Sequence, residues 1–166
     1  MGASGWSYFT AYQENINNAL QELKQAVFRK GKYGHTAQTN QEELSKYPQL
    51  KESIEKLKML DEQRLAEYGP IKTIDDLLEA FGEEGTHTII DIDRISSKPD
   101  FGVAYPAPIN VIEKIYGTKK PTHNNIASKE GILSEELNIE RWQAVYVLVY
   151  DNGIPKEIYF EGCSGD

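Results

Sequence analysis

The C-terminal part of the chain contains the pattern that most restricts the fold. Two runs of apolar, β-branched and aromatic residues, AVYVLVY at 144–150 and IPKEIYF at 154–160, lie on either side of Asn152-Gly153. Asn-Gly between two such runs is the strongest short signal for a β-hairpin, because both residues tolerate the positive φ angles of a two-residue turn. The chain must therefore contain an antiparallel pair of strands. Pro155 lacks an amide hydrogen, so we expect that side of the last strand to lie at a sheet edge.

Other segments add strands and helices to this hairpin. WSYFTAYQ, at 6–13, and GTHTIIDIDRIS, at 85–96, each predict a strand, whereas the three prolines of 98–108 predict a loop. Apolar residues at helical spacing predict helices that contain 16–27, 41–68, 74–81 and 109–116. The fold class is therefore α+β: a small antiparallel or mixed sheet of about four strands, with a C-terminal β-hairpin, packed by four to five helices.

The length bounds the domain organisation. A chain of 166 residues has the usual size of one domain, so we expect residues 1–166 to form a single α+β domain. Within it, 41–68 is a charged helical segment whose apolar stripe includes Ile54, Leu57 and Leu65. This stripe fits either a helix packed on the surface of the core or a peripheral insertion.

Composition and charge exclude several classes of function. The net charge is −8 and the pI about 5.0, so the average field of the protein repels a nucleic-acid backbone. No apolar run approaches the roughly 18–20 residues that cross a membrane. The single cysteine, Cys163, excludes an intramolecular disulfide and a cysteine-rich zinc site. We therefore expect a cytoplasmic protein that binds neither nucleic acid nor membrane and needs no metal or cofactor.

The acidic residues are distributed unevenly. No Lys or Arg lies between Lys72 and Arg94, a segment that contains the acidic set Asp75, Asp76, Glu79, Glu83 and Glu84. Such a segment is either a solvated face or a docking surface for a basic protein. The second interpretation gives the leading functional expectation: an acidic protein-binding module, such as an inhibitor or an immunity-like partner of a basic protein.

The predicted strand at 85–96 places His87, Asp91 and Asp93 on one face. In an extended strand His87 and Asp91 would lie about 13 Å apart, too far for a direct hydrogen bond. Asp91 and Asp93 would lie about 6.6 Å apart, which permits a shared cation at a bend or an acid–base pair of carboxylates. The alternative is that the acids only mark the exit of the strand into solvent.

A ligand site is the alternative function. If the first and last strands flank 85–96, they bring candidate ligand-binding residues together; these are Trp6, Tyr8, His87, Asp91, Asp93 and Ser164. Such a site would serve a small enzyme or a binder of a nucleotide-like ligand, with His87, Asp91 and Glu161 as catalytic candidates. The glycine-rich stretches 2–5 and 162–166 either cradle an anion or form flexible termini.

Three short motifs resemble those of a family of small, uncharacterised bacterial proteins. They are G-x-S-G-W-x-Y near the start, G-T-H-x-I-x-D in the centre and S-G-D at the end. The matching blocks cover about half of the chain, and 41–68 is its variable part. The resemblance implies a bacterial cytoplasmic protein and brings no activity with it.

Overall fold

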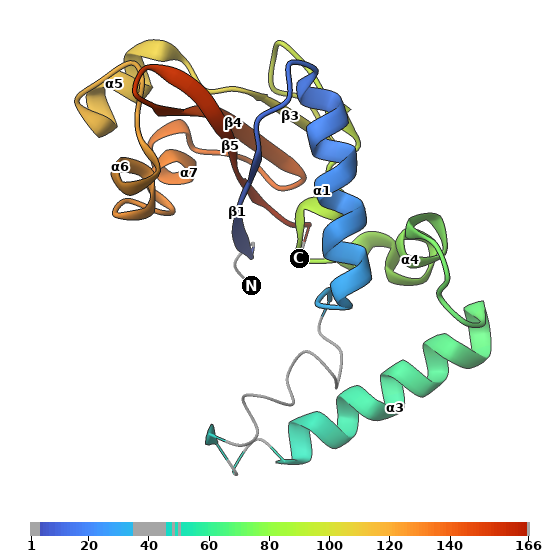
Figure 1. The fold of residues 1–166 in the computed structure, drawn as a ribbon. Coiled ribbons are helices and arrows are strands. Elements are labelled where there is room, and N and C mark those ends of the chain that lie inside the picture. Colours follow the sequence, from blue (N-terminus) through green and yellow to red (C-terminus); the bar gives the residue numbers. More distant parts are fainter. Residues whose placement is uncertain (1–3, 35–45, 48, 50, 166) are drawn as a thin grey trace.

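The computed structural model describes residues 4–34, 46, 47, 49 and 51–165. Among them a five-stranded mixed sheet forms the centre of the molecule (Figure 1). Its spatial order is β1-β5-β4-β3-β2. The strands are β1 (Gly5–Ala11), β2 (Arg94–Ile95), β3 (Val103–Pro106), β4 (Gln143–Asp151) and β5 (Ile154–Cys163). The α+β class is confirmed, with one strand more than the sequence predicts.

The predicted C-terminal hairpin is present as β4 and β5. Asn152 and Gly153 have φ angles of 49° and 78°, as a two-residue hairpin turn requires. The last strand is not an edge strand, because β1 pairs with β5 on the side opposite β4. This part of the prediction is wrong for the strand as a whole. Pro155 nevertheless has a strand neighbour on one side only, since β1 ends opposite Glu157.

β2 and β3 extend the hairpin with parallel pairing. β3 lies inside the predicted loop 98–108, so that prediction is wrong for four of its residues. Its only proline, Pro106, occupies the last position of the strand, where a missing amide donor is tolerated.

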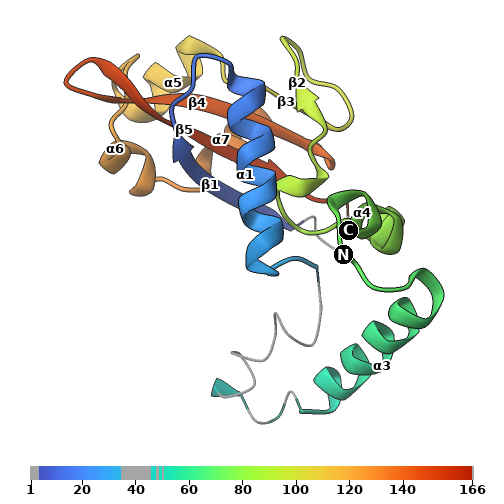
Figure 2. The same ribbon diagram turned by 45° about the vertical axis from the view of Figure 1, so that its right-hand side comes forward.

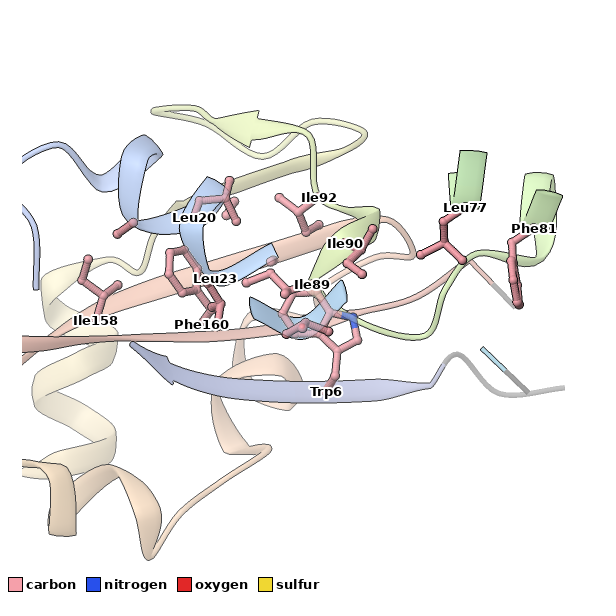
Figure 3. Close-up of a cluster of buried hydrophobic side chains, with 14 of the residues drawn as sticks. Trp6, Leu20, Leu23, Leu77, Phe81, Ile89, Ile90, Ile92, Ile158 and Phe160 are labelled. Carbon is pink, nitrogen blue, oxygen red and sulfur yellow. The ribbon is translucent and has the colours of Figure 1, made fainter. Parts of the chain in front are cut away.

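Helices cover both faces of the sheet (Figures 1 and 2). The described residues form six α-helices: α1 (Ile16–Lys30), α3 (Lys51–Tyr68), α4 (Ile74–Phe81), α5 (Ile109–Tyr116), α6 (His123–Ala127) and α7 (Ile132–Leu137). α1 begins at the side-chain cap Asn15 and ends at Gly31, whose φ is 66°. One core packs Trp6, Leu20 and Phe160 under α1 (Figure 3), and a second core on the opposite face includes Tyr159.

The segment 85–96 is not a strand, apart from the two residues of β2. Ile89–Asp91 forms a single 3-10 turn, η3, and His87 has a φ of 56°. The reason is local: the Thr88 hydroxyl accepts a hydrogen bond from the amide of Ile90 at 3.1 Å. Such side-chain bonds offer the backbone an alternative to a sheet ladder. Ile89, Ile90 and Asp91 are buried, whereas Asp93 and Arg94 are exposed, so the segment reaches solvent only towards its end.

α3 is the described part of the predicted helical segment 41–68. Residues 41–45, 48 and 50 lie outside the described residues, so a short first helix there is not tested. α3 lies beside α4, away from the sheet in both views (Figures 1 and 2). Ile54 is buried, whereas Leu60 and Leu65 are 46% and 57% exposed. Within the described ranges, no helix has the length and apolar character needed to cross a bilayer.

Candidate functional site

Three segments that are distant in sequence meet at one end of the sheet. β1 and β5 are neighbours, and the amide of Ser164 donates a hydrogen bond to the carbonyl of Ser4 at 3.0 Å. The Trp6 ring lies against Gly162, where a β-carbon would be 2.6 Å from it. Asp91, from η3, lies close enough to Ser164 for the hydroxyl to affect its pKa. The N-terminal, central and C-terminal blocks therefore form one structural centre.

Asp91 is the ionisable group of this centre. Its side chain is only 7% exposed, and Oδ1 accepts a hydrogen bond from the amide of Thr86 at 2.7 Å. Oδ2 has no hydrogen-bond partner of normal geometry among the described residues. Burial raises the pKa of Asp91, although the Thr86 and Ser164 groups and the nearby His87 favour its ionised form. A carboxyl group that is buried with its pKa raised is costly to keep ionised, and such groups are typical of functional sites.

Other polar groups of the centre are also buried. Trp6 Nε1 and Ser164 Oγ lack a hydrogen-bond partner of normal geometry within the described part of the chain. Burial and the negative charge of Asp91 together raise the pKa of Tyr8 to about 12. The predicted ligand-binding residues Trp6, Tyr8, Asp91 and Ser164 therefore come together.

His87 belongs to the same centre. The distance of about 13 Å that an extended strand would impose between His87 and Asp91 does not apply, because η3 bends the chain. His87 instead interacts electrostatically with Asp91. Its left-handed backbone, with a φ of 56°, stores strain of a kind that clusters at functional sites.

Trp142 closes the centre from the residue before β4. It has a φ of 62°, an unusual conformation for a bulky side chain. Its ring packs on two glycines: a β-carbon would lie 1.9 Å from it at Gly165 and 3.0 Å from it at Gly85. A β-carbon at Gly85 would also lie 3.0 Å from Asp91 Oδ2. The glycines near the C-terminus thus seat Trp6 and Trp142, which neither an anion cradle nor flexible termini would predict.

A pocket of about 250 Å³ opens beside Asp91 and Trp142. Its charged wall consists of Lys24, Asp91, Asp93 and Arg94. The aromatic wall is formed by Trp142 and Phe101, whose ring centroids are 5.6 Å apart. Leu78 from α4 and Ile90 from η3 supply apolar surface. This combination of apolar walls and a few polar groups is typical of small-molecule sites.

Lys24 is a pocket residue that the sequence reasoning missed. It is 5% exposed, and its ammonium donates a hydrogen bond to the carbonyl of Ile92 at 2.6 Å. Burial lowers its pKa, although Asp93, Asp91 and Asp75 act in the opposite direction. A signal was present: position 24 follows Leu20 by four residues and so lies on the buried face of α1. Phe101 and Trp142, by contrast, carry no sequence pattern that marks them.

Glu161 lies on the other face of the sheet, away from Asp91. It is 2% exposed and accepts hydrogen bonds from the amides of Gly131 and Ser134, at 3.0 and 2.6 Å, and from the Tyr159 hydroxyl at 2.6 Å. The Ser134 hydroxyl is a further donor. Glu161 therefore joins β5 to the start of α7 and is not brought together with the other catalytic candidates.

Asp93 lies at the mouth of the pocket. Its side chain is 78% exposed and pairs with Arg94 at 3.6 Å. No group of three His, Cys, Asp or Glu side chains within the described residues is arranged to hold a metal ion.

The predicted acidic docking set divides into structural and exposed members. Asp76 closes the capping box of α4 and accepts the amides of Lys72 and Thr73 at 2.9 and 2.8 Å, which lower its pKa. Glu84 pairs with Arg64 at 2.5 Å. Asp75 and Glu79 are exposed, and the side chain of Glu83 lies outside what the structure describes.

Comparison with known proteins leaves the question of function to this geometry. No protein-family model matches the chain, and no curated protein or solved structure matches it.

Proposed function

We propose that this protein binds a small polar ligand in the pocket beside Asp91. One observation carries the proposal: a buried carboxylate, only 7% exposed, borders a pocket that has both charged and aromatic walls. A protein that needed only a stable core would gain by replacing such a group with an apolar one. The strained backbones of His87 and Trp142, which flank Asp91, support the same conclusion.

The pocket also bears on the class of ligand. Its volume of about 250 Å³ lies below the range of about 300–1,000 Å³ that holds drug-sized ligands. The acids Asp91, Asp93 and Asp100 in or beside it outnumber the cations Lys24 and Arg94, and this excess would disfavour the several negative charges of a nucleotide. These features favour a ligand smaller than a nucleotide. A catalytic use of His87 and Asp91 on such a ligand is the alternative within the same site.

A ligand screen by thermal unfolding tests this function. A ligand at about 100 times its Kd stabilises the folded state by about 2.7 kcal/mol, which raises the Tm of a chain of this size by several degrees. We expect Asp91→Asn to lose this shift and the matched exposed variant Asp151→Asn to retain it. The amide side chain can still accept the hydrogen bond from Thr86. An equal shift in Asp91→Asn, or no shift with any class of small polar molecule, would contradict the proposal.

A second candidate function is docking of a basic protein in the cytoplasm. The observation that favours it is exposed acid on α4, where Asp75 and Glu79 both face solvent. The net charge of −8 would attract a basic partner and repel nucleic acid.

Binding of an arginine-rich peptide at varied salt concentration tests the docking function. Asp75→Asn combined with Glu79→Gln should weaken binding and reduce its salt dependence, whereas Glu52→Gln combined with Glu55→Gln on α3 should change neither. Asp76 is left intact because it caps α4. Equal affinities of both variants and the wild type at low salt would argue against docking at this surface.

A further inference from the structure

We infer that the ligand of this pocket is a zwitterion of amino-acid size that carries an apolar or aromatic side chain. The inference rests on the proposed function and names its ligand class. In this arrangement the ammonium group of the ligand faces Asp93 and Asp91, and its carboxylate faces Arg94 and Lys24. The side chain of the ligand lies against the aromatic wall.

The balance of charge in the wall carries the first step. The pocket is bordered by two carboxylates, Asp91 and Asp93, and by two cations, Lys24 and Arg94. A ligand with a charge of only one sign would meet two like charges in this small volume. A zwitterion can place each of its charges beside the opposite one, so the wall discriminates in its favour.

The depth of these four groups gives the second step. Asp91 and Lys24 are 7% and 5% exposed, so they act as fixed charges behind the pocket surface. The side chains of Asp93 and Arg94 are 78% and 55% exposed, and their nearest charged atoms are 3.6 Å apart. Arg94 also pairs with Asp100 at 3.7 Å, again through exposed side chains. Exposed pairs of this kind contribute little to stability. Their carboxylate and guanidinium can therefore turn from each other to a ligand at little cost.

The apolar wall gives the third step. Phe101 is 67% exposed although its ring lies near that of Trp142, so an aromatic surface is open at the pocket. Leu78 and Ile90 extend the apolar wall. A flat or branched apolar group of the ligand would cover this surface, and an aromatic one would also gain from ring packing.

Three probes of similar shape test the inference on the full chain. L-phenylalanine carries both charges, phenethylamine carries only the ammonium, and 3-phenylpropanoate carries only the carboxylate. Binding is followed by calorimetry and by the fluorescence of the two tryptophans. We expect L-phenylalanine to bind about tenfold more tightly than either analogue, because each analogue lacks one of the two charge-assisted interactions.

Two variants at the pocket mouth assign the charges. Arg94→Gln should remove the preference for L-phenylalanine over phenethylamine. Asp93→Asn should remove the preference for L-phenylalanine over 3-phenylpropanoate. Lys98→Gln and Asp151→Asn, both exposed, are the matched controls and should leave both preferences unchanged.

The possible failures are distinguishable. The inference is overturned if either singly charged analogue binds as tightly as L-phenylalanine, or if none of the three binds at millimolar concentration. If the thermal screen still finds a ligand that depends on Asp91, the proposed binding function stands and only its ligand class is wrong. A screen without any such ligand overturns both.

Discussion

The indole ring of Trp142 lies directly on the backbone of Gly165: a β-carbon at that position would be 1.9 Å from the ring. The same ring is near Gly85 and forms one wall of the pocket beside Asp91. Packing of the C-terminal residues therefore sets the shape of a pocket whose charged groups come from the middle of the chain and from α1. A substitution near the C-terminus should therefore change the affinity of the pocket for its ligand.

Gly165→Ala tests this coupling. The added methyl group must displace the Trp142 ring, and overpacking of this kind costs about 1–3 kcal/mol of stability. We expect an altered near-ultraviolet circular dichroism spectrum and weaker ligand binding. Gly5→Ala is the matched control, because a β-carbon there would meet only the carbonyl oxygen of Gly162, at 4.0 Å. Unchanged spectra for both variants would show that the ring does not depend on Gly165.

Asp91→Asn should make the free protein more stable at neutral pH. The pKa of Asp91 is raised by burial, so the folded state binds its proton more tightly than the unfolded state does. Stability from this group is fully present below its unfolded pKa of about 3.9 and is lost as pH rises through the higher folded pKa. As pH rises from the unfolded pKa through the folded pKa of Asp91, the free energy of unfolding of Asp91→Asn should therefore increase relative to that of the wild type.

Urea unfolding at a series of pH values measures this difference. Asp151→Asn, at an exposed position, should follow the wild type at every pH. A gap between Asp91→Asn and the wild type that is constant with pH would mean that Asp91 has the same pKa in both states. If the variant is also the one that loses ligand binding, stability has been exchanged for function at this position.

Glu161→Gln should affect stability and leave ligand binding intact. Glu161 accepts hydrogen bonds from two amides and two hydroxyl groups, and a glutamine would turn one donor group towards these donors. The expected loss is about 2 kcal/mol or more in urea unfolding. The control is Glu130→Gln, at an exposed position bonded to Ser7 at 2.9 Å. Loss of ligand affinity without loss of stability would instead place Glu161 in the binding site.

The sequence predicts those parts of the fold whose determinants are local. Asn152-Gly153 predicts the hairpin because the turn itself needs residues that tolerate positive φ. The helix after Thr73 is predicted because Thr73 and Asp76, the two residues of its capping box, lie within four consecutive positions of the sequence. At 85–96 the same kind of reasoning fails, because alternation of apolar and polar residues does not reveal that the Thr88 hydroxyl diverts the backbone into a turn.

The candidate site is predictable only in part, for a related reason. The sequence blocks indicate Trp6, Asp91 and Ser164 as candidates, and the sheet order brings those blocks together. Phe101 and Trp142 join them only through pairing of β3 with β4, which has no local signature. Glu161 shows the opposite case: a buried acid that looks functional in sequence is used to hold α7.

Lys24→Met tests whether the buried ammonium shapes both the fold and the pocket. The variant keeps the aliphatic bulk but leaves the carbonyl of Ile92 without its donor, at a cost of about 1–3 kcal/mol. Burial lowers the pKa of Lys24, so its contribution to stability rises as pH approaches the unfolded value of about 10.4. In urea titrations at alkaline pH, the free energy of unfolding of the wild type should therefore rise relative to that of Lys24→Met. Lys30→Met, at an exposed position at the end of α1, should not show this pH dependence.

Lys24→Met should also weaken L-phenylalanine binding more than phenethylamine binding, since only L-phenylalanine has a carboxylate. A parallel loss for both probes would mean that Lys24 acts through the backbone at Ile92 alone.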